Sequence, residues 1–175
     1  MNEVIKAIKE RRSIRSFRPD AVPKELIGQI AEAGTYAASG RGMQSPVIIA
    51  VTDKELLGRL RRANCAIGGW NSDFDPFYGA PAVLIVLADK SRPTCIYDGS
   101  LVMGDLMLAA HSLGLGSCWI HRAKEEFETE EFRELLAGLG LKGEYEGIGH
   151  CALGYYDPPA PAPAPRKENR VFFLG

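Results

Sequence analysis

The chain has 175 residues, 46% hydrophobic and 25% charged, which suits one globular domain and does not favour two independent ones. A formal net charge of −1 gives no general attraction to nucleic acid or to an anionic membrane, so any basic site must be local. No apolar run reaches the ~18–20 residues that span a bilayer. The N-terminal residues also lack the continuous apolar block of a signal peptide, so we expect a cytoplasmic protein.

Apolar periodicity predicts two helices before the first strand. The first covers residues 3–12, and the second begins at Pro23, whose missing N–H costs nothing at the first position of a helix. A glycine-rich loop at 39–43 follows. The β-branched run at 46–51 then predicts a buried strand, and Thr-x-x-Glu at 52–55 predicts the capping box of a third helix.

The second half alternates strands with helices, after an irregular aromatic stretch at 66–80. The helix expected at 98–113 carries few polar residues, which predicts burial on most of its sides. This alternation fits an α+β fold in which helices cover a sheet. The remaining expected elements are strands at 82–87, 117–120 and about 147–155, and a helix at 130–139 capped by Thr129.

The end of the chain differs in composition from the rest. The proline-rich stretch from Asp157 to Pro165 favours extended polyproline II, with a reach of about 25 Å at ~3.1 Å per residue. It continues into four apolar residues at 171–174. We expect one domain at 1–157 and an arm at 158–175 that docks, on another subunit for instance; a floppy terminus with an accidental apolar end is the alternative.

Four arginines gather within eight residues at 11–18, in a chain with no net positive charge. Guanidinium groups suit phosphate and carbonyl-rich rings. In an extended segment, Arg11, Ser13 and Arg15 would lie on one side. A solvated basic helix end, favoured by the helix dipole, explains the same residues equally well.

Other chemistries find little support. The loop around Gln44 is no dinucleotide fingerprint, because it follows a helix and precedes a strand. There is no nucleophile elbow and no H-E-x-x-H motif, and the carboxylates form no evident pair for acid–base work. His111 is expected in the core, and the four isolated cysteines are expected to be reduced core residues that bind no metal. Such a chain predicts chemistry carried by a bound cofactor.

Four sequence blocks, in this order, resemble the nitroreductase family. They are Arg-Arg-Ser-x-Arg-x-Phe at 11–17, Ala-Ala-Ser-Gly-Arg-Gly-x-Gln-Ser-Pro at 37–46, Asp-Pro-Phe-Tyr-Gly-Ala-Pro at 75–81 and the stretch from Asp98 to Ile120. The resemblance extends over residues 3–170. It departs from the family's common pattern at Gly42, Ser45, Pro46 and His121.

The resemblance implies an α+β fold with a central, mainly antiparallel sheet, an arm that embraces the partner of a homodimer, and FMN at the subunit interface. Chemistry would take place on FMN, with no catalytic side chain. Asn64 and Asn71 are both candidates to contact the pyrimidine ring. The implied FMN-binding residues are Arg11, Arg12, Ser13 and Arg15; Ser39, Gly40 and Gln44; Trp119, Ile120, His121 and Arg122; and Arg166 and Lys167.

The implied activity is ping-pong reduction of nitroaromatics, quinones or similar small acceptors by NADH or NADPH through FMN. An FMN-binding or storage module without useful turnover is the first alternative. A non-flavin interaction protein, whose arginines meet an acidic partner, is the second. The three differ in colour and in their response to reduced nicotinamide.

Overall fold

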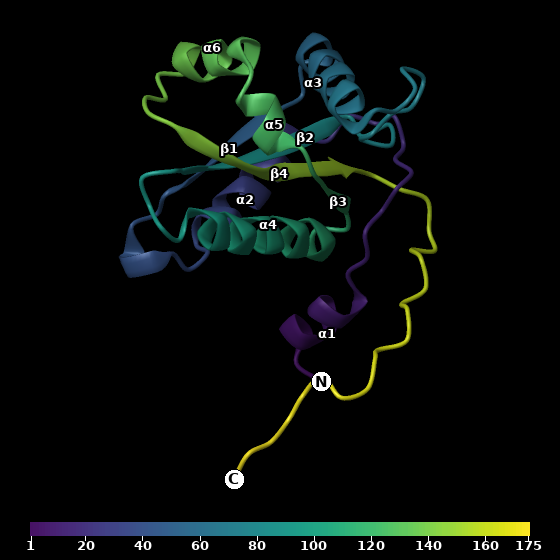
Figure 1. Ribbon diagram of the computed structural model, residues 1–175. Coiled ribbons are helices and arrows are strands. Elements are labelled where there is room, and N and C mark those ends of the chain that lie inside the picture. Colours follow the sequence, from purple (N-terminus) through teal and green to yellow (C-terminus); the bar gives the residue numbers. More distant parts are fainter.

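The computed structural model describes all 175 residues. Eleven elements follow one another along the chain (Figure 1). No helix combines the length and apolar character needed to cross a membrane. The elements are α1 (Glu3–Glu10), α2 (Lys24–Thr35), the 3-10 helix η1 (Gly40–Gly42), β1 (Pro46–Val51), α3 (Lys54–Gly68), β2 (Ala82–Asp89), α4 (Cys95–Ser112), β3 (Gly116–Ile120), α5 (Ala123–Phe127), α6 (Glu130–Gly138) and β4 (Tyr145–Gly154).

The four strands form one antiparallel sheet in the order β1-β2-β4-β3. The central strand β2 is buried from Ala82 to Ala88, as a run of valine, isoleucine and leucine covered on both faces should be. Helices α2 and α4 cover one face of the sheet, and α3, α5 and α6 cover the other (Figure 1). The expected α+β fold with helices flanking an antiparallel sheet is therefore confirmed.

Strand β4 contains a bulge at Ile148. Leu87 pairs with Gly147 and Val86 pairs with Gly149, so Ile148 has no partner on β2. A bulge of this kind redirects side chains and is common beside functional sites. Here it lies where β4 passes the end of β3.

Several helix ends differ from the sequence predictions. The first helix ends at Glu10, not residue 12, because the chain then turns extended to run beside β3. The third helix is capped by Asp53, whose Oδ1 accepts a hydrogen bond from the Leu56 amide at 2.8 Å, and not by the predicted Thr52 box. Thr129 precedes α6, but its hydroxyl donates to the Glu126 carbonyl instead of capping the helix.

The fourth helix departs most from its expected burial. It starts three residues early, at Cys95, and one side of it faces outward with no partner in the chain. His111, expected in the core, is half-buried near its end, as is Cys95 at its start. The exposed apolar residues of this side are Ile96, Tyr97, Leu101 and Leu113.

Helix α1 and the C-terminal residues are also apolar and exposed. The side chains of Val4, Ile5 and Ile8 on α1 are 48–59% exposed. The C-terminal arm, residues 158–175, leaves the body of the molecule and packs on none of its helices (Figure 1). Its last apolar residues, from Val171 to Leu174, are 73–98% exposed.

Candidate functional site

The segment at 11–15 lies along the outer edge of the sheet. The Ile14 amide donates to the Ser117 carbonyl of β3 at 2.9 Å, and Ser13 forms a parallel bridge with Ser117. Ile14 is buried, which turns its neighbours outward. Burial raises the pKa of the Cys118 thiol, while Arg15, the Ser13 side chain and Arg11 oppose that rise. Ser13 therefore lies beside β3, and Arg11 and Arg15 stand two residues before and after it in the same segment.

Arg11 and Arg12 are oriented differently. The Nη1 of Arg12 donates to the carbonyls of Lys9 and Arg11, at 2.6 and 2.7 Å, and so satisfies the end of α1. Nevertheless, Nε of Arg12 and Nη1 of Arg11 are buried without a hydrogen-bond partner. A buried guanidinium nitrogen without an acceptor is costly, so the two groups are suited to an anion arriving from outside the chain.

The stretch from Trp119 to Arg122, here called the 119–122 segment, continues β3 past the arginines. The Trp119 indole donates to the Ile148 carbonyl at 3.3 Å, and its ring stacks on His121 with centroids 5.9 Å apart. The Arg122 guanidinium lies 4.3 Å from the centroid of the Trp70 ring. With Ile120 buried beneath, the segment presents two aromatic rings and a cation beside a cavity of about 610 Å³.

The glycine-rich loop lies at the start of β1. Ser39 Oγ accepts from the Gln44 amide at 2.9 Å, and the Gly40 amide donates to Oδ1 of Asp98 at 3.0 Å. A side chain at position 40 would clash with Thr94, so the close approach of the loop to α4 needs glycine there. Asp98 is buried and also accepts from Ser45 and Thr94; its anchoring role was not foreseen from the sequence.

Comparison with known proteins adds the decisive observation. A family model described as "Nitroreductase family" matches residues 8–155. The chain belongs to the nitroreductase family. A relative in Methanothermobacter thermautotrophicus, provisionally named an NADH dehydrogenase/NAD(P)H nitroreductase, is 32% identical over 139 residues, which is 77% of this chain and 69% of that protein.

Two further relatives are named for FMN. An FMN reductase [NAD(P)H] of Bacillus subtilis is 31% identical over 160 residues, covering 78% of this chain and 60% of that protein. The crystal structure of a nitroreductase with bound FMN from Bacteroides fragilis superposes with a TM-score of 0.87 at 28% identity, over 100% of both chains.

Within this nitroreductase-family chain, the predicted residues fall into three groups. The arginine segment and the 119–122 segment share the β3 edge. The loop residues Ser39, Gly40 and Gln44 lie at β1, which is the opposite edge of the sheet. Arg166 and Lys167 are exposed on the arm and bond to no other residue.

The strand register measures how far apart the first two groups are. Pro46 aligns through Ala88 with Glu146 on β4, whereas Ser117 aligns with Leu153. Three strand spacings and seven residues of β4 therefore separate the loop from the arginine segment, which is roughly 14 Å across the sheet and ~23 Å along it. Ile120 of the 119–122 segment aligns with His150, so that segment is only four residues of β4 away. One chain does not bring the loop and the arginine segment together.

The two asparagines left open by the sequence are placed differently. Asn64 is fully buried in α3, and its amide is engaged within the protein. Asn71 is exposed, and its Oδ1 accepts from the Asp73 amide. Trp70, which no sequence pattern singled out as a site residue, is the member of this loop that contacts the 119–122 segment.

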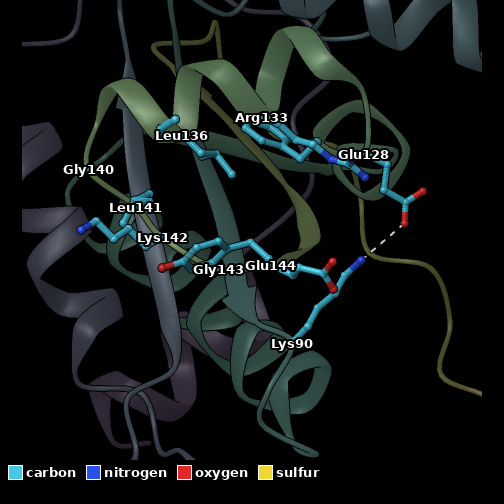
Figure 2. A pocket seen from close by; sticks show the side chains of 12 residues that line it. Lys90, Glu128, Arg133, Leu136, Gly140, Leu141, Lys142, Gly143 and Glu144 are labelled. Carbon is cyan, nitrogen blue, oxygen red and sulfur yellow. Dashed lines mark ion pairs between the residues drawn. The ribbon is translucent and has the colours of Figure 1, made fainter.

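A second cavity lies apart from these groups, between α6 and the start of β4 (Figure 2). Its volume is about 560 Å³ and none of the predicted site residues lines it. Lys90 at its rim pairs with Glu128 at 3.5 Å, so these charges are already compensated. No group of three His, Cys, Asp or Glu side chains in residues 1–175 is arranged to hold a metal ion.

Proposed function

We propose that this chain is an FMN-dependent oxidoreductase that uses NADH or NADPH to reduce small acceptors such as nitroaromatics and quinones. The observation that carries the proposal is the β3 edge. There, Arg11 and Arg12 offer buried donors without acceptors, and the aromatic 119–122 segment follows directly. Family membership and relatives that are named FMN reductase or hold FMN support it.

The residues of the β3 edge fit the groups of FMN. A phosphate monoester carries about −1.5 to −2 charges and three strong acceptor oxygens. Arg11, Ser13 and Arg15 supply donors for it, and Arg12 has one further N–H to give. Trp119, Ile120, His121 and Arg122 would then lie along the ring, and positive charge beside a ring that gains electrons stabilises its reduced form.

When bound, FMN supplies the ring that accepts a hydride from the nicotinamide and passes electrons to the acceptor. The nicotinamide and the acceptor would occupy the same face of the ring one after the other, which predicts ping-pong kinetics. The protein would bind the phosphate and orient the ring. No side chain is required to transfer a proton in the flavin half-reaction.

We further propose a cytoplasmic homodimer in which each site draws on two chains. Ser39, Gly40 and Gln44 of a second copy would complete a site that one chain leaves in two parts. Arg166 and Lys167 on the arm would add donors to the phosphate. The exposed apolar residues of α1 and α4, and the apolar end of the arm, support this assembly because a single chain leaves them in solvent.

The visible absorption spectrum of the purified protein, before and after anaerobic NADH or NADPH, tests the proposal. We expect a yellow protein that bleaches with one or both donors. A yellow protein that stays yellow would instead favour an FMN-binding or storage module. A colourless protein that takes up no added FMN would refute the assignment.

A further inference from the structure

Three polar side chains meet in the layer between the sheet and helices α3 and α5. Asn64 of α3, Glu126 of α5 and His150 of β4 are all 0% exposed. Nε2 of His150 lies 2.8 Å from Oε2 of Glu126, and the Asn64 amide donates to Oε1 of Glu126 at 2.7 Å. Burying such a pair is costly, and apolar residues of similar volume often give a more stable core. Stability alone does not account for this cluster.

Asn64 connects the cluster to the 119–122 segment. Its Nδ2 also donates to the backbone carbonyl of His121 at 2.9 Å. Glu126 belongs to α5, which begins at Ala123, directly after the turn at Arg122. The Asn64 side chain therefore hydrogen-bonds to His121 before Arg122 and to Glu126 after it.

The turn needs such support. Arg122 has φ 80° and ψ 6°, a left-handed conformation that is unfavourable for a residue with a Cβ. Residues held in this region persist when surrounding contacts over-determine them. On the sheet side, side chains at Gly147 and Gly149 would clash with the Ala123 backbone and the Trp119 indole, so β4 fits closely against the segment. The His121 carbonyl depends on Asn64.

We infer that Asn64, Glu126 and His150 are positioning residues that hold the His121–Arg122 turn in the orientation needed beside bound FMN. His150 contacts the Glu126 carboxylate from the sheet, although neither atom of that contact has a hydrogen-bond partner. Glu126 accepts from the Asn64 amide, and that amide also holds the His121 carbonyl. The inference rests on the proposed function, because the turn matters to turnover only when FMN lies against it. Phosphate binding is separate, since Arg11, Ser13 and Arg15 form no hydrogen bond or ion pair with the cluster.

The test compares Asn64→Leu with Leu57→Ala in the FMN-loaded protein. Asn64→Leu keeps the number and branching of the side-chain heavy atoms but removes both hydrogen bonds. Leu57→Ala disturbs the same buried face of α3 two turns earlier, where the leucine side chain makes no hydrogen bond to the turn. The measurements are FMN content, the visible circular dichroism of the bound flavin, and the limiting rate of its reduction by NADH or NADPH.

We expect Asn64→Leu to retain FMN, to change the visible circular dichroism and to slow reduction about 10–100-fold, the effect of an ångström-scale misplacement. Leu57→Ala should keep the wild-type spectrum and rate. Glu126→Gln, which keeps an oxygen for the Asn64 amide, should retain more activity than Asn64→Leu. An unchanged rate in Asn64→Leu, or equal losses in Asn64→Leu and Leu57→Ala, would overturn the inference.

A double-mutant cycle with Arg122→Gly tests the mechanism. Glycine adopts the left-handed conformation without strain, so the turn should no longer depend on Asn64. The loss from Asn64→Leu should shrink in that background, and equal losses in both backgrounds would overturn the inference. Asn64→Ser replaces Asn64→Leu in every comparison if the leucine variant does not fold. A wild-type protein that takes up no FMN would refute the proposed function and this inference together, whereas unaltered Asn64 variants of a working flavoprotein refute this inference alone.

Discussion

At the scale of single residues, Arg11 presents a half-buried cation with no internal acceptor. Its Nη1 is buried without a hydrogen-bond partner, and no carboxylate of the chain pairs with it. Arg11→Ala should therefore weaken FMN binding by about 10–100-fold, because a hydrogen bond to a charged group contributes about 1.5–3 kcal/mol. The apoprotein should lose no stability. Titration of apoprotein with FMN, followed by flavin fluorescence, measures the first effect, and urea unfolding measures the second.

Arg18→Ala is the matched control for that prediction. Arg18 belongs to the same arginine cluster, but its guanidinium is exposed and paired with Asp20 at 2.8 Å. We expect FMN affinity in this variant to equal that of the wild type. Equal losses in the two variants would mean that general positive charge, and not the β3 edge, attracts the cofactor.

Cys151 gives the protein a specific sensitivity to alkaline pH. Burial raises the pKa of its thiol from an ordinary value near 9 to about 12. Below pH 9 both states keep the proton. As the pH rises from 9 towards 12, the unfolded chain loses a proton that the folded chain keeps, so the free energy of unfolding falls.

Urea unfolding at about pH 8 and about pH 11 checks this linkage. Wild type should lose more stability between the two conditions than Cys151→Ala, which has no thiol to ionise. Cys95→Ala, altered at a half-buried cysteine, should behave as the wild type does. Identical losses of stability in wild type and Cys151→Ala would show that Cys151 is not the source of the alkaline sensitivity.

At the scale of elements, the start of α3 separates two neighbouring candidates for a helix cap. Asp53 accepts the Leu56 amide, so Asp53→Ala should destabilise the protein by about 1 kcal/mol. Thr52→Ala should have a much smaller effect, because the Thr52 hydroxyl caps nothing. Chemical denaturation of the two variants measures which of them loses more stability. A larger loss in Thr52→Ala would support the capping box that the sequence predicts.

Sequence reasoning succeeded where a pattern is continuous and failed where it is short or distant. The β-branched runs of β1 and β2 predicted both strands, but only β2 is buried on both faces. The expected burial of β1 was wrong, because β1 is an edge strand and mostly half-buried. Helix α5 was missed, since five residues are too few to show a helical period. The boundaries of α3 and α4 shifted because several adjacent residues can each begin a helix.

In the candidate site too, residues close in sequence were predicted and pairs distant in sequence were missed. Alternation placed Arg11, Ser13 and Arg15 together, because these residues are close in sequence and lie in one extended segment. The anchoring of Gly40 by Asp98 joins residues 58 apart, and the bond from Asn64 to Glu126 joins residues 62 apart. Sequence patterns within one helix or strand cannot predict pairs so far apart in the chain, because the two residues meet only in the folded protein.

At the scale of the whole molecule, the arm is expected to act in assembly and not in folding. No residue beyond Gly154 belongs to the buried core. Deleting residues 158–175 should therefore leave the thermal unfolding of the apoprotein monomer unchanged while it weakens the dimer and lowers FMN content. Sedimentation velocity and the ratio of flavin to protein absorbance measure both quantities. Deleting Gly175 alone is the control, and a truncated protein that keeps a full-strength dimer with bound FMN would contradict the prediction.

The placement of the two groups of site residues on opposite edges of one sheet also affects how the protein must be handled. When a second chain completes each site, subunit association and cofactor binding become one linked equilibrium. Specific activity should then fall as the protein is diluted, and excess free FMN should restore it by drawing monomers together. Turnover assays on this chain are therefore best compared at a fixed protein concentration, since dilution alone would resemble a loss of catalytic power.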